Sequence, residues 1–149
     1  MLQMSKAITY LQELLEQPLS YGIKSINSEL FVFRFGPSLD ALQENTTSQI
    51  CTYNLHVMCG IKIVSKIEKK TIKEYSGNSS YEVFSRDIIQ LIGLTVKRVA
   101  LSEKNDIWID FGEYWVIIVT NEDDDESWRF FSSDDNRRHL VASDSWIDY

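Results

Sequence analysis

Hydrophobic and polar residues alternate most regularly between residues 51 and 63. The apolar set occupies every second position and consists of Cys51, Tyr53, Leu55, Val57, Cys59, Ile61 and Ile63. Neighbouring side chains of a β-strand point to opposite faces, so this pattern predicts one long strand with a single buried face. Gly60 marks a place where that strand can bend.

Two other segments carry apolar residues at helical spacing. The first covers residues 5–17, with Ser5 as its expected N-cap and Pro18 as its stop. The second covers about residues 80–92, where Ser79 and Glu82 have the spacing of a capping box and Gly93 is typical of a helix end. The pattern therefore predicts two amphipathic helices.

The remaining apolar segments are short and separated by turn residues, which indicates β-structure. We expect strands at residues 21–27, 29–35, 66–75, 95–101, 106–111, 114–120, 127–131 and 139–142. We interpret residues 38–49 as a loop, with a short helix at 39–42 as the alternative. Short connections after Leu94 favour an antiparallel meander. The predicted fold is a single α+β domain over residues 1–149, mainly an antiparallel sheet with two helices.

Composition agrees with a globular domain, since 44% of the 149 residues are hydrophobic and 25% are charged. No apolar run approaches the roughly 20 residues that cross a bilayer, and no secretory signal is evident, so we expect a cytoplasmic protein. Cys51 and Cys59 would lie roughly 26 Å apart along one strand, too far for a disulfide.

The net charge of −7 is distributed unevenly along the chain. Residues 1–100 hold 11 Lys and Arg against 9 Asp and Glu, a net of +2, whereas residues 101–149 hold 4 against 13, a net of −9. An acidic surface disfavours nucleic acid and anionic membranes as partners. It favours a basic protein partner and would speed the encounter with one.

No arrangement of residues indicates catalysis or a cofactor. The two cysteines and two histidines lack the close pairs of a zinc site, and the run at 122–126 lacks the glycine and spacing of a calcium loop. Both thiols share the apolar face of the predicted strand, where burial suppresses their reactivity. No nucleophile elbow, phosphate-binding loop or dinucleotide motif occurs. We therefore predict a protein that is not an enzyme and binds no metal or cofactor.

The four tryptophans all fall in the acidic third of the chain. In the strand expected at 106–111, Trp108 shares a face with Asp106 and Asp110, which is typical of a binding anchor because tryptophan is enriched in interface hot spots. Trp128 is expected in the core. The predicted partner-binding residues are Trp108, Asp106, Asp110, Glu122, Asp123, Asp124, Asp125, Glu126, Asp134 and Asp135.

Several short motifs resemble a loose group of small uncharacterised bacterial proteins. They include the segments at 56–64, 91–94, 107–111, 126–129 and 139–141, and the stretch at 58–60 departs from the group, which has Gln before the cysteine and Pro-Trp-Arg after it. Some such proteins are encoded beside polymorphic toxin genes. The resemblance implies an immunity protein that neutralises a cognate toxin, and it carries over no catalytic residue.

Our leading hypothesis is a non-catalytic immunity protein whose acidic, tryptophan-bearing face occludes a basic toxin domain such as a nuclease. The alternative is a small-molecule-binding or accessory module, with a cavity between the long strand and the second helix and His56 at its mouth. A third hypothesis is an enzyme in which His56 or His139 is hydrogen-bonded to a carboxylate in a cleft.

Overall fold

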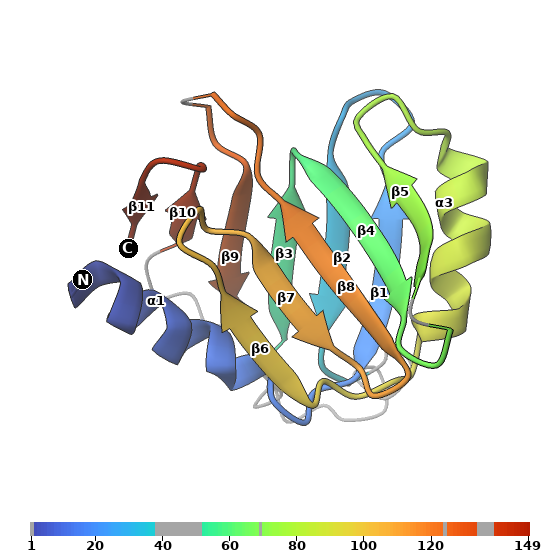
Figure 1. Ribbon diagram of the computed structural model, residues 1–149, viewed down its shortest axis with the longest axis horizontal. Coiled ribbons are helices and arrows are strands. Elements are labelled where there is room, and N and C mark those ends of the chain that lie inside the picture. The colour runs from blue at the N-terminus through green and yellow to red at the C-terminus, as the bar shows by residue number, and fades with distance from the viewer. Residues whose placement is uncertain (1, 38–51, 69, 124, 134–138) are drawn as a thin grey trace.

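The computed structural model describes residues 2–37, 52–68, 70–123, 125–133 and 139–149, which form two antiparallel sheets and two α-helices (Figure 1). Sheet 1 has the strand order β1 (Leu19–Lys24), β2 (Phe31–Phe35), β3 (Tyr53–Val57), β9 (Trp128–Ser132), β10 (Leu140–Ala142), β11 (Ile147–Asp148). Sheet 2 has the order β5 (Lys70–Tyr75), β4 (Gly60–Ser65), β8 (Tyr114–Val119), β7 (Ile107–Asp110), β6 (Arg98–Leu101). The helices are α1 (Leu2–Leu11) and α3 (Tyr81–Ile88), followed by the 3-10 turns η1 (Gln12–Leu14) and η2 (Ile89–Leu91). The predicted α+β class is confirmed.

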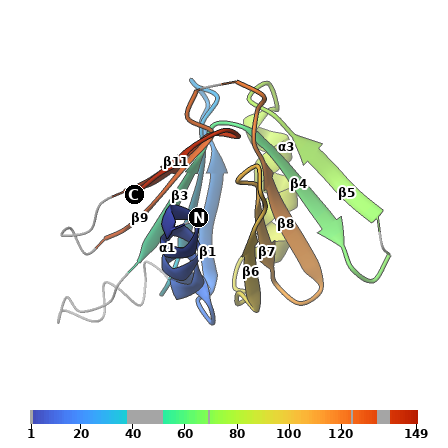
Figure 2. The same cartoon turned by 60° about the vertical axis from the view of Figure 1, so that its left-hand side comes forward.

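The two sheets face each other across one hydrophobic core. Figure 2 shows them close together at one end and splayed apart at the other. The alternate residues Phe31, Phe33 and Phe35 of β2 point into this space and are buried, as predicted. Phe35 stacks on Phe111, which directly follows β7, with ring centroids 6.4 Å apart. Burial of these rings is the main favourable term that holds the sheets together.

The predicted long strand is two strands in different sheets. β3 ends at Val57 in sheet 1, and β4 begins at Gly60 in sheet 2. The backbone N–H of Met58 donates to the carbonyl of Ser127 at 2.7 Å, which continues the pairing of β3 with β9 by one residue before the chain passes to sheet 2. The alternation nevertheless continues, with Val57, Cys59 and Ile61 all buried, because the inner faces of both sheets border the same core. Because apolar and polar residues alternate without interruption, the sequence gives no sign that the chain passes from β3 in one sheet to β4 in the other.

The two helices close the two open sides between the sheets. Helix α1 contacts both β11 and β6, the edge strands of sheets 1 and 2 on one side. Helix α3 contacts β1, and its Phe84 meets Tyr75 of β5 on the other side. The Tyr75 hydroxyl also donates to the Asp87 carboxylate at 2.7 Å. Each helix thus buries its apolar face and covers the gap between two edge strands. Without the helix, the core would be open to solvent there.

The helix boundaries differ from those expected at 5–17 and 80–92. Helix α1 starts at Leu2, so Ser5 lies inside it rather than at its N-cap. Helix α3 is capped by Ser80, not Ser79, because the Ser80 Oγ accepts the Val83 N–H at 3.1 Å. Ser79 instead accepts the Ser76 N–H. Both helices end in a tighter 3-10 turn, and Gly93 follows with the expected positive φ of 94°.

Replacing Ser80 by alanine is expected to lower the free energy of unfolding by about 1 kcal/mol, because an N-terminal N–H of α3 loses its acceptor. Urea denaturation followed by far-UV circular dichroism measures this difference. An unchanged unfolding free energy would show that the Ser80 cap does not stabilise α3.

The predicted meander holds only in part. Strands β6, β7 and β8 are antiparallel neighbours, but β9 leaves them and pairs with β3 and β10 in sheet 1. The connection at 120–127 crosses between the sheets, just as the link from β3 to β4 does. Strand β11 was not predicted, since two residues are too few to show alternation. The helix or loop considered at 39–42 lies outside the described residues.

Candidate partner-binding surface

The outer face of sheet 2 displays two tryptophans. Trp108 on β7 and Trp115 on β8 point away from the core and meet edge to face, with ring centroids 5.6 Å apart. Trp108 is 39% exposed, whereas Ile117, its cross-strand partner on the same face, is only 7% exposed. We call Trp108, Trp115 and Ile117 the tryptophan patch. Figure 1 looks onto this face, and none of the described elements lies in front of it.

Asp110, expected to face a partner as a free carboxylate, is engaged within the fold. Its Oδ2 lies 2.6 Å from Lys66 Nζ and 3.1 Å from Arg98 Nε, and the residue is 5% exposed. Burial alone would raise the pKa of Asp110, but hydrogen bonds from Lys66, the Gly112 N–H and Arg98 hold it below the usual value. The border of the tryptophan patch at Asp110 is therefore not acidic.

Lys66 and Arg98, the two cations beside Asp110, also lie next to the tryptophan patch. Lys66 Nζ lies 5.2 Å from the centroid of the Trp115 ring, a distance at which ammonium and ring attract each other. Arg98, Asp110 and the two tryptophans line a hollow of about 210 Å³. Because the tryptophans are fixed by strands and by these neighbours, little side-chain freedom remains to be lost when a partner binds.

Asp106 anchors the connection that leads to the acidic run. Its Oδ1 accepts both the backbone N–H and the hydroxyl of Thr120, at 2.8 and 2.9 Å. Thr120 is the first residue after β8, so the carboxylate fixes the root of the 120–127 connection beside β7. Asp106 is therefore a positioning residue in this fold rather than a free charge.

The acidic loop, residues 120–127, borders a hollow at the junction of the two sheets. The hollow is about 490 Å³ in volume and is lined by Ser28, Glu29, Leu30, Met58, Asn121, Asp123, Asp125 and Glu126. The structure thus adds Glu29, from the turn between β1 and β2, to the predicted carboxylates. Glu122, Asp123 and Asp125 are exposed. Asp124, Asp134 and Asp135 lie outside the described residues.

Strand β8 connects the tryptophan patch with the acidic loop. Val116 and Ile118 pair with inward residues of β4, so Trp115, Ile117 and Val119 form the outward column of β8. That column runs directly into Thr120 and the carboxylates that follow. Those predicted site residues that the structure describes therefore occupy two neighbouring places, one apolar with a neutralised carboxylate and one strongly acidic.

The two histidines meet on the outer face of sheet 1. Both rings pack on Phe131, His56 edge to face at 5.0 Å and His139 stacked at 4.3 Å. In the described residues neither imidazole is hydrogen-bonded to a carboxylate, and His139 Nδ1 instead lies 3.1 Å from an Arg129 nitrogen. Burial, and then the charge of Arg129, lower the pKa of His56. The hydrogen bond to a carboxylate that was considered for a histidine-based enzyme is therefore absent from the part of the chain that the structure describes.

The placement of His56 at the mouth of a cavity between the long strand and the second helix is wrong. His56 is the cross-strand partner of Val32, on the outward side of sheet 1. Helix α3 packs from the core side, where Phe84 meets Phe31 at 4.9 Å. The imidazole and the helix are therefore on opposite sides of the sheet.

Cys59 shows no sign of nucleophilic or metal chemistry. It is a free thiol, and burial raises its pKa to about 12. Among the described residues, no group of three or more His, Cys, Asp and Glu side chains is placed to hold a metal ion. Cys51 lies outside the described residues.

We expect Cys59 to resist iodoacetamide in the native protein at pH 8, because only the thiolate reacts and burial keeps that fraction very small. In urea above the unfolding midpoint the same thiol should be alkylated completely. Peptide mapping by mass spectrometry distinguishes it from Cys51. Fast alkylation of native Cys59 would contradict the burial described above.

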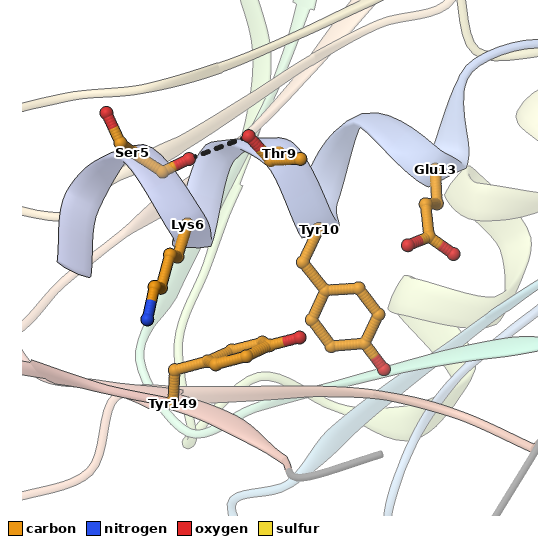
Figure 3. A pocket seen from close by; sticks show the side chains of 6 residues that line it. All are labelled: Ser5, Lys6, Thr9, Tyr10, Glu13 and Tyr149. Atoms are coloured by element: carbon orange, nitrogen blue, oxygen red, sulfur yellow. Dashed lines mark hydrogen bonds between the residues drawn. The ribbon is translucent and has the colours of Figure 1, made fainter. Parts of the chain in front are cut away.

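A further hollow, of about 410 Å³, lies between α1 and the C-terminal residues (Figure 3). Its lining residues are Ser5, Lys6, Thr9, Tyr10, Glu13 and Tyr149. Most of its polar groups already have partners. The Thr9 hydroxyl donates to the Ser5 carbonyl, the Tyr10 oxygen accepts the Ser132 N–H, and Glu13 accepts the Tyr53 hydroxyl. The bond to Tyr10 connects α1 to β9, and the bond to Glu13 connects η1 to β3.

No protein-family model, curated protein or solved structure matches the chain. None of the described helices has the length and apolar character needed to cross a membrane. The surface therefore has to be interpreted from its own residues.

Sequence reasoning missed Trp115, Lys66 and Arg98. The register of the predicted β6–β7 hairpin could have placed Arg98 opposite Asp110. Trp115 follows from the outward alternation of β8 once its neighbours on β4 are known. Lys66 carries no such signal, because it approaches Asp110 from a turn 44 positions earlier in the chain.

Proposed function

We propose that this protein is a non-catalytic binding protein that presents the outer face of sheet 2 to a protein partner. The observation that carries this proposal is Trp108, which is 39% exposed on a strand and braced edge to face by Trp115. Water contact with so large an apolar ring is unfavourable, and tryptophan is one of the residues enriched in interface hot spots.

The acidic loop supports a basic partner. Its carboxylates border a hollow whose lining includes the apolar side chains Leu30 and Met58, a combination that suits the aliphatic stem and charged head of a lysine or arginine. Asp110 is already neutralised by Lys66 and Arg98, so the electrostatic attraction would come from the acidic loop and from Glu29 beside it. The tryptophan patch would supply most of the affinity and the loop most of the association rate.

The resemblance to proteins encoded beside toxin genes makes a cognate toxin domain our candidate partner, with the complex forming in the bacterial cytoplasm. Inhibition would be steric, since a partner held on this face has part of its own basic surface covered. A nuclease domain fits best, because its substrate-binding surface is positively charged.

Neutralising the acidic loop tests the charge mechanism. In the variant carrying Glu122→Gln, Asp123→Asn and Asp125→Asn, we expect the association rate constant with the cognate toxin domain to fall about tenfold at low salt. Stopped-flow measurements over a range of ionic strength should also show a weaker salt dependence.

The matched control replaces three exposed carboxylates elsewhere, by Glu16→Gln, Glu68→Gln and Glu82→Gln, and should leave the association rate nearly unchanged. Equal rates and equal salt dependence for the loop variant and the native protein would rule out the charge mechanism. Failure of the native protein to bind the toxin domain at all would rule out the proposed partner.

A further inference from the structure

The turn between β1 and β2 forms one wall of the hollow that borders the acidic loop. Its residues Ser28, Glu29 and Leu30 line that hollow. Of the other carboxylates in the lining, Glu126 is already paired with Arg129. Within the described residues, the Glu29 side chain has neither a hydrogen bond nor an ion pair. Its carboxylate is therefore available to a partner.

Gly77, in the turn between β5 and α3, fixes the stem of Glu29. Figure 1 shows this turn at the same end of the molecule as the turn between β1 and β2. A Cβ placed on Gly77 would lie 2.7 Å from both Cβ and Cγ of Glu29 and 2.9 Å from its Cδ. Non-bonded carbon atoms do not approach so closely, since their optimal separation is about 3.5–4.0 Å. Only a glycine therefore allows the Glu29 side chain to lie across this turn.

A buried lysine holds the backbone of the turn between β1 and β2. Lys24 is 4% exposed, and its Nζ donates to the carbonyl oxygens of Ser25 and Ser28, at 2.9 and 2.5 Å. Hydrogen bonds from a charged donor are stronger than those between neutral groups. The Ser25 N–H also closes the turn by donating to the Leu30 carbonyl at 2.8 Å. The backbone that carries Glu29 is thus fixed before any partner arrives.

We infer that Glu29 is a preorganised binding carboxylate, held by Gly77 and Lys24 so that a lysine or arginine of the partner pairs with it inside the hollow. This inference rests on the proposed function, because the partner is the one assigned there. A charge pair that is desolvated on binding controls mainly the dissociation rate, whereas exposed charges at the rim control mainly the association rate. Glu29 and the acidic loop should therefore differ in the rate constant that each controls.

A double-mutant cycle tests the positioning in the isolated protein. Gly77→Ala should lower the urea midpoint of the native protein, because the new methyl group meets Glu29. It should still lower the midpoint in Glu29→Ala, which keeps the Cβ atom, but hardly at all in Glu29→Gly, where all three contacting atoms are absent. Gly60→Ala is the matched control and should not lower the midpoint, since a Cβ on Gly60 meets no atom closer than 3.6 Å.

Surface plasmon resonance with the cognate toxin domain tests the role in binding. In Glu29→Gln, we expect the dissociation rate constant to rise about tenfold and the association rate constant to change by less than about twofold. Gly77→Ala should also raise the dissociation rate constant. Adding it to Glu29→Gln should cause little further change, because both substitutions act on the same carboxylate. Glu82→Gln, at an exposed carboxylate on α3, is the control and should leave both rate constants unchanged.

An unchanged dissociation rate constant in Glu29→Gln would overturn the role of Glu29. An equal loss of stability for Gly77→Ala in the native and Glu29→Gly backgrounds would overturn the positioning by Gly77. If the native protein does not bind the toxin domain, the proposed function fails, and with it the role of Glu29 in binding. The double-mutant cycle contains no partner, so it still decides whether Gly77 positions Glu29.

Discussion

Replacing Phe84 by alanine is expected to lower the free energy of unfolding by about 3–5 kcal/mol. The ring is fully buried and lies edge to face against Phe31, Phe33 and Tyr75, so it joins α3 to strands of both sheets. Removing it leaves a cavity at the side of the core that α3 closes, and neither sheet can collapse into it without losing strand pairing. Urea denaturation followed by circular dichroism measures the change.

The control for Phe84 is Ile89→Ala in the 3-10 turn that follows α3. Ile89 is 70% exposed, so its truncation should change the unfolding free energy by less than about 1 kcal/mol. A loss below about 1 kcal/mol for Phe84→Ala itself would mean that α3 is not packed between the sheets as described.

Replacing Trp108 by alanine is expected to weaken binding of the partner toxin domain by about 2 kcal/mol or more, which corresponds to roughly 30-fold in Kd. The indole is the most exposed member of the tryptophan patch, and its removal takes away apolar contact area and the edge-to-face contact with Trp115. Isothermal titration calorimetry gives the Kd directly. The unfolding free energy should change far less than for Phe84→Ala, because Trp108 lies outside the core.

Tyr21→Ala provides a matched control for Trp108. Tyr21 is also aromatic and is 38% exposed, but it belongs to β1 in sheet 1. This substitution should leave the Kd within about threefold, the scale of an uninvolved surface position. A larger loss of affinity for Tyr21→Ala than for Trp108→Ala would place the partner on sheet 1 and contradict the proposed surface.

The sequence was informative wherever one face of a strand is buried. The alternation of Phe31, Phe33 and Phe35, and of Tyr53 through Ile63, identified the inward residues correctly. Trp128 was also placed correctly in the core, where its indole N–H donates to the Asn105 carbonyl at 2.8 Å. These residues could be identified because burying one face of a strand is favourable and requires apolar residues at alternate positions. That alternation is visible in the sequence itself.

The sequence could not show how the strands divide between the sheets. Crossing at Met58 and at the acidic loop leaves the alternation intact, so a single strand and a meander were natural but wrong interpretations. The state of Asp110 was hidden for a related reason. Arg98 could have been placed opposite Asp110 from the register of a hairpin, but Lys66 comes from a turn distant in the chain, and only the tertiary fold brings it to the carboxylate.

The indole N–H signals of the four tryptophans provide the most direct test of the binding surface. In ¹H–¹⁵N spectra recorded while the unlabelled toxin domain is added, we predict that the signals of Trp108 and Trp115 shift or broaden. The signal of fully buried Trp128, and that of Trp146 near the C-terminal end, should stay in place. Saturating binding with Trp108 and Trp115 unperturbed would contradict the assignment of the outer face of sheet 2 as the partner-binding surface.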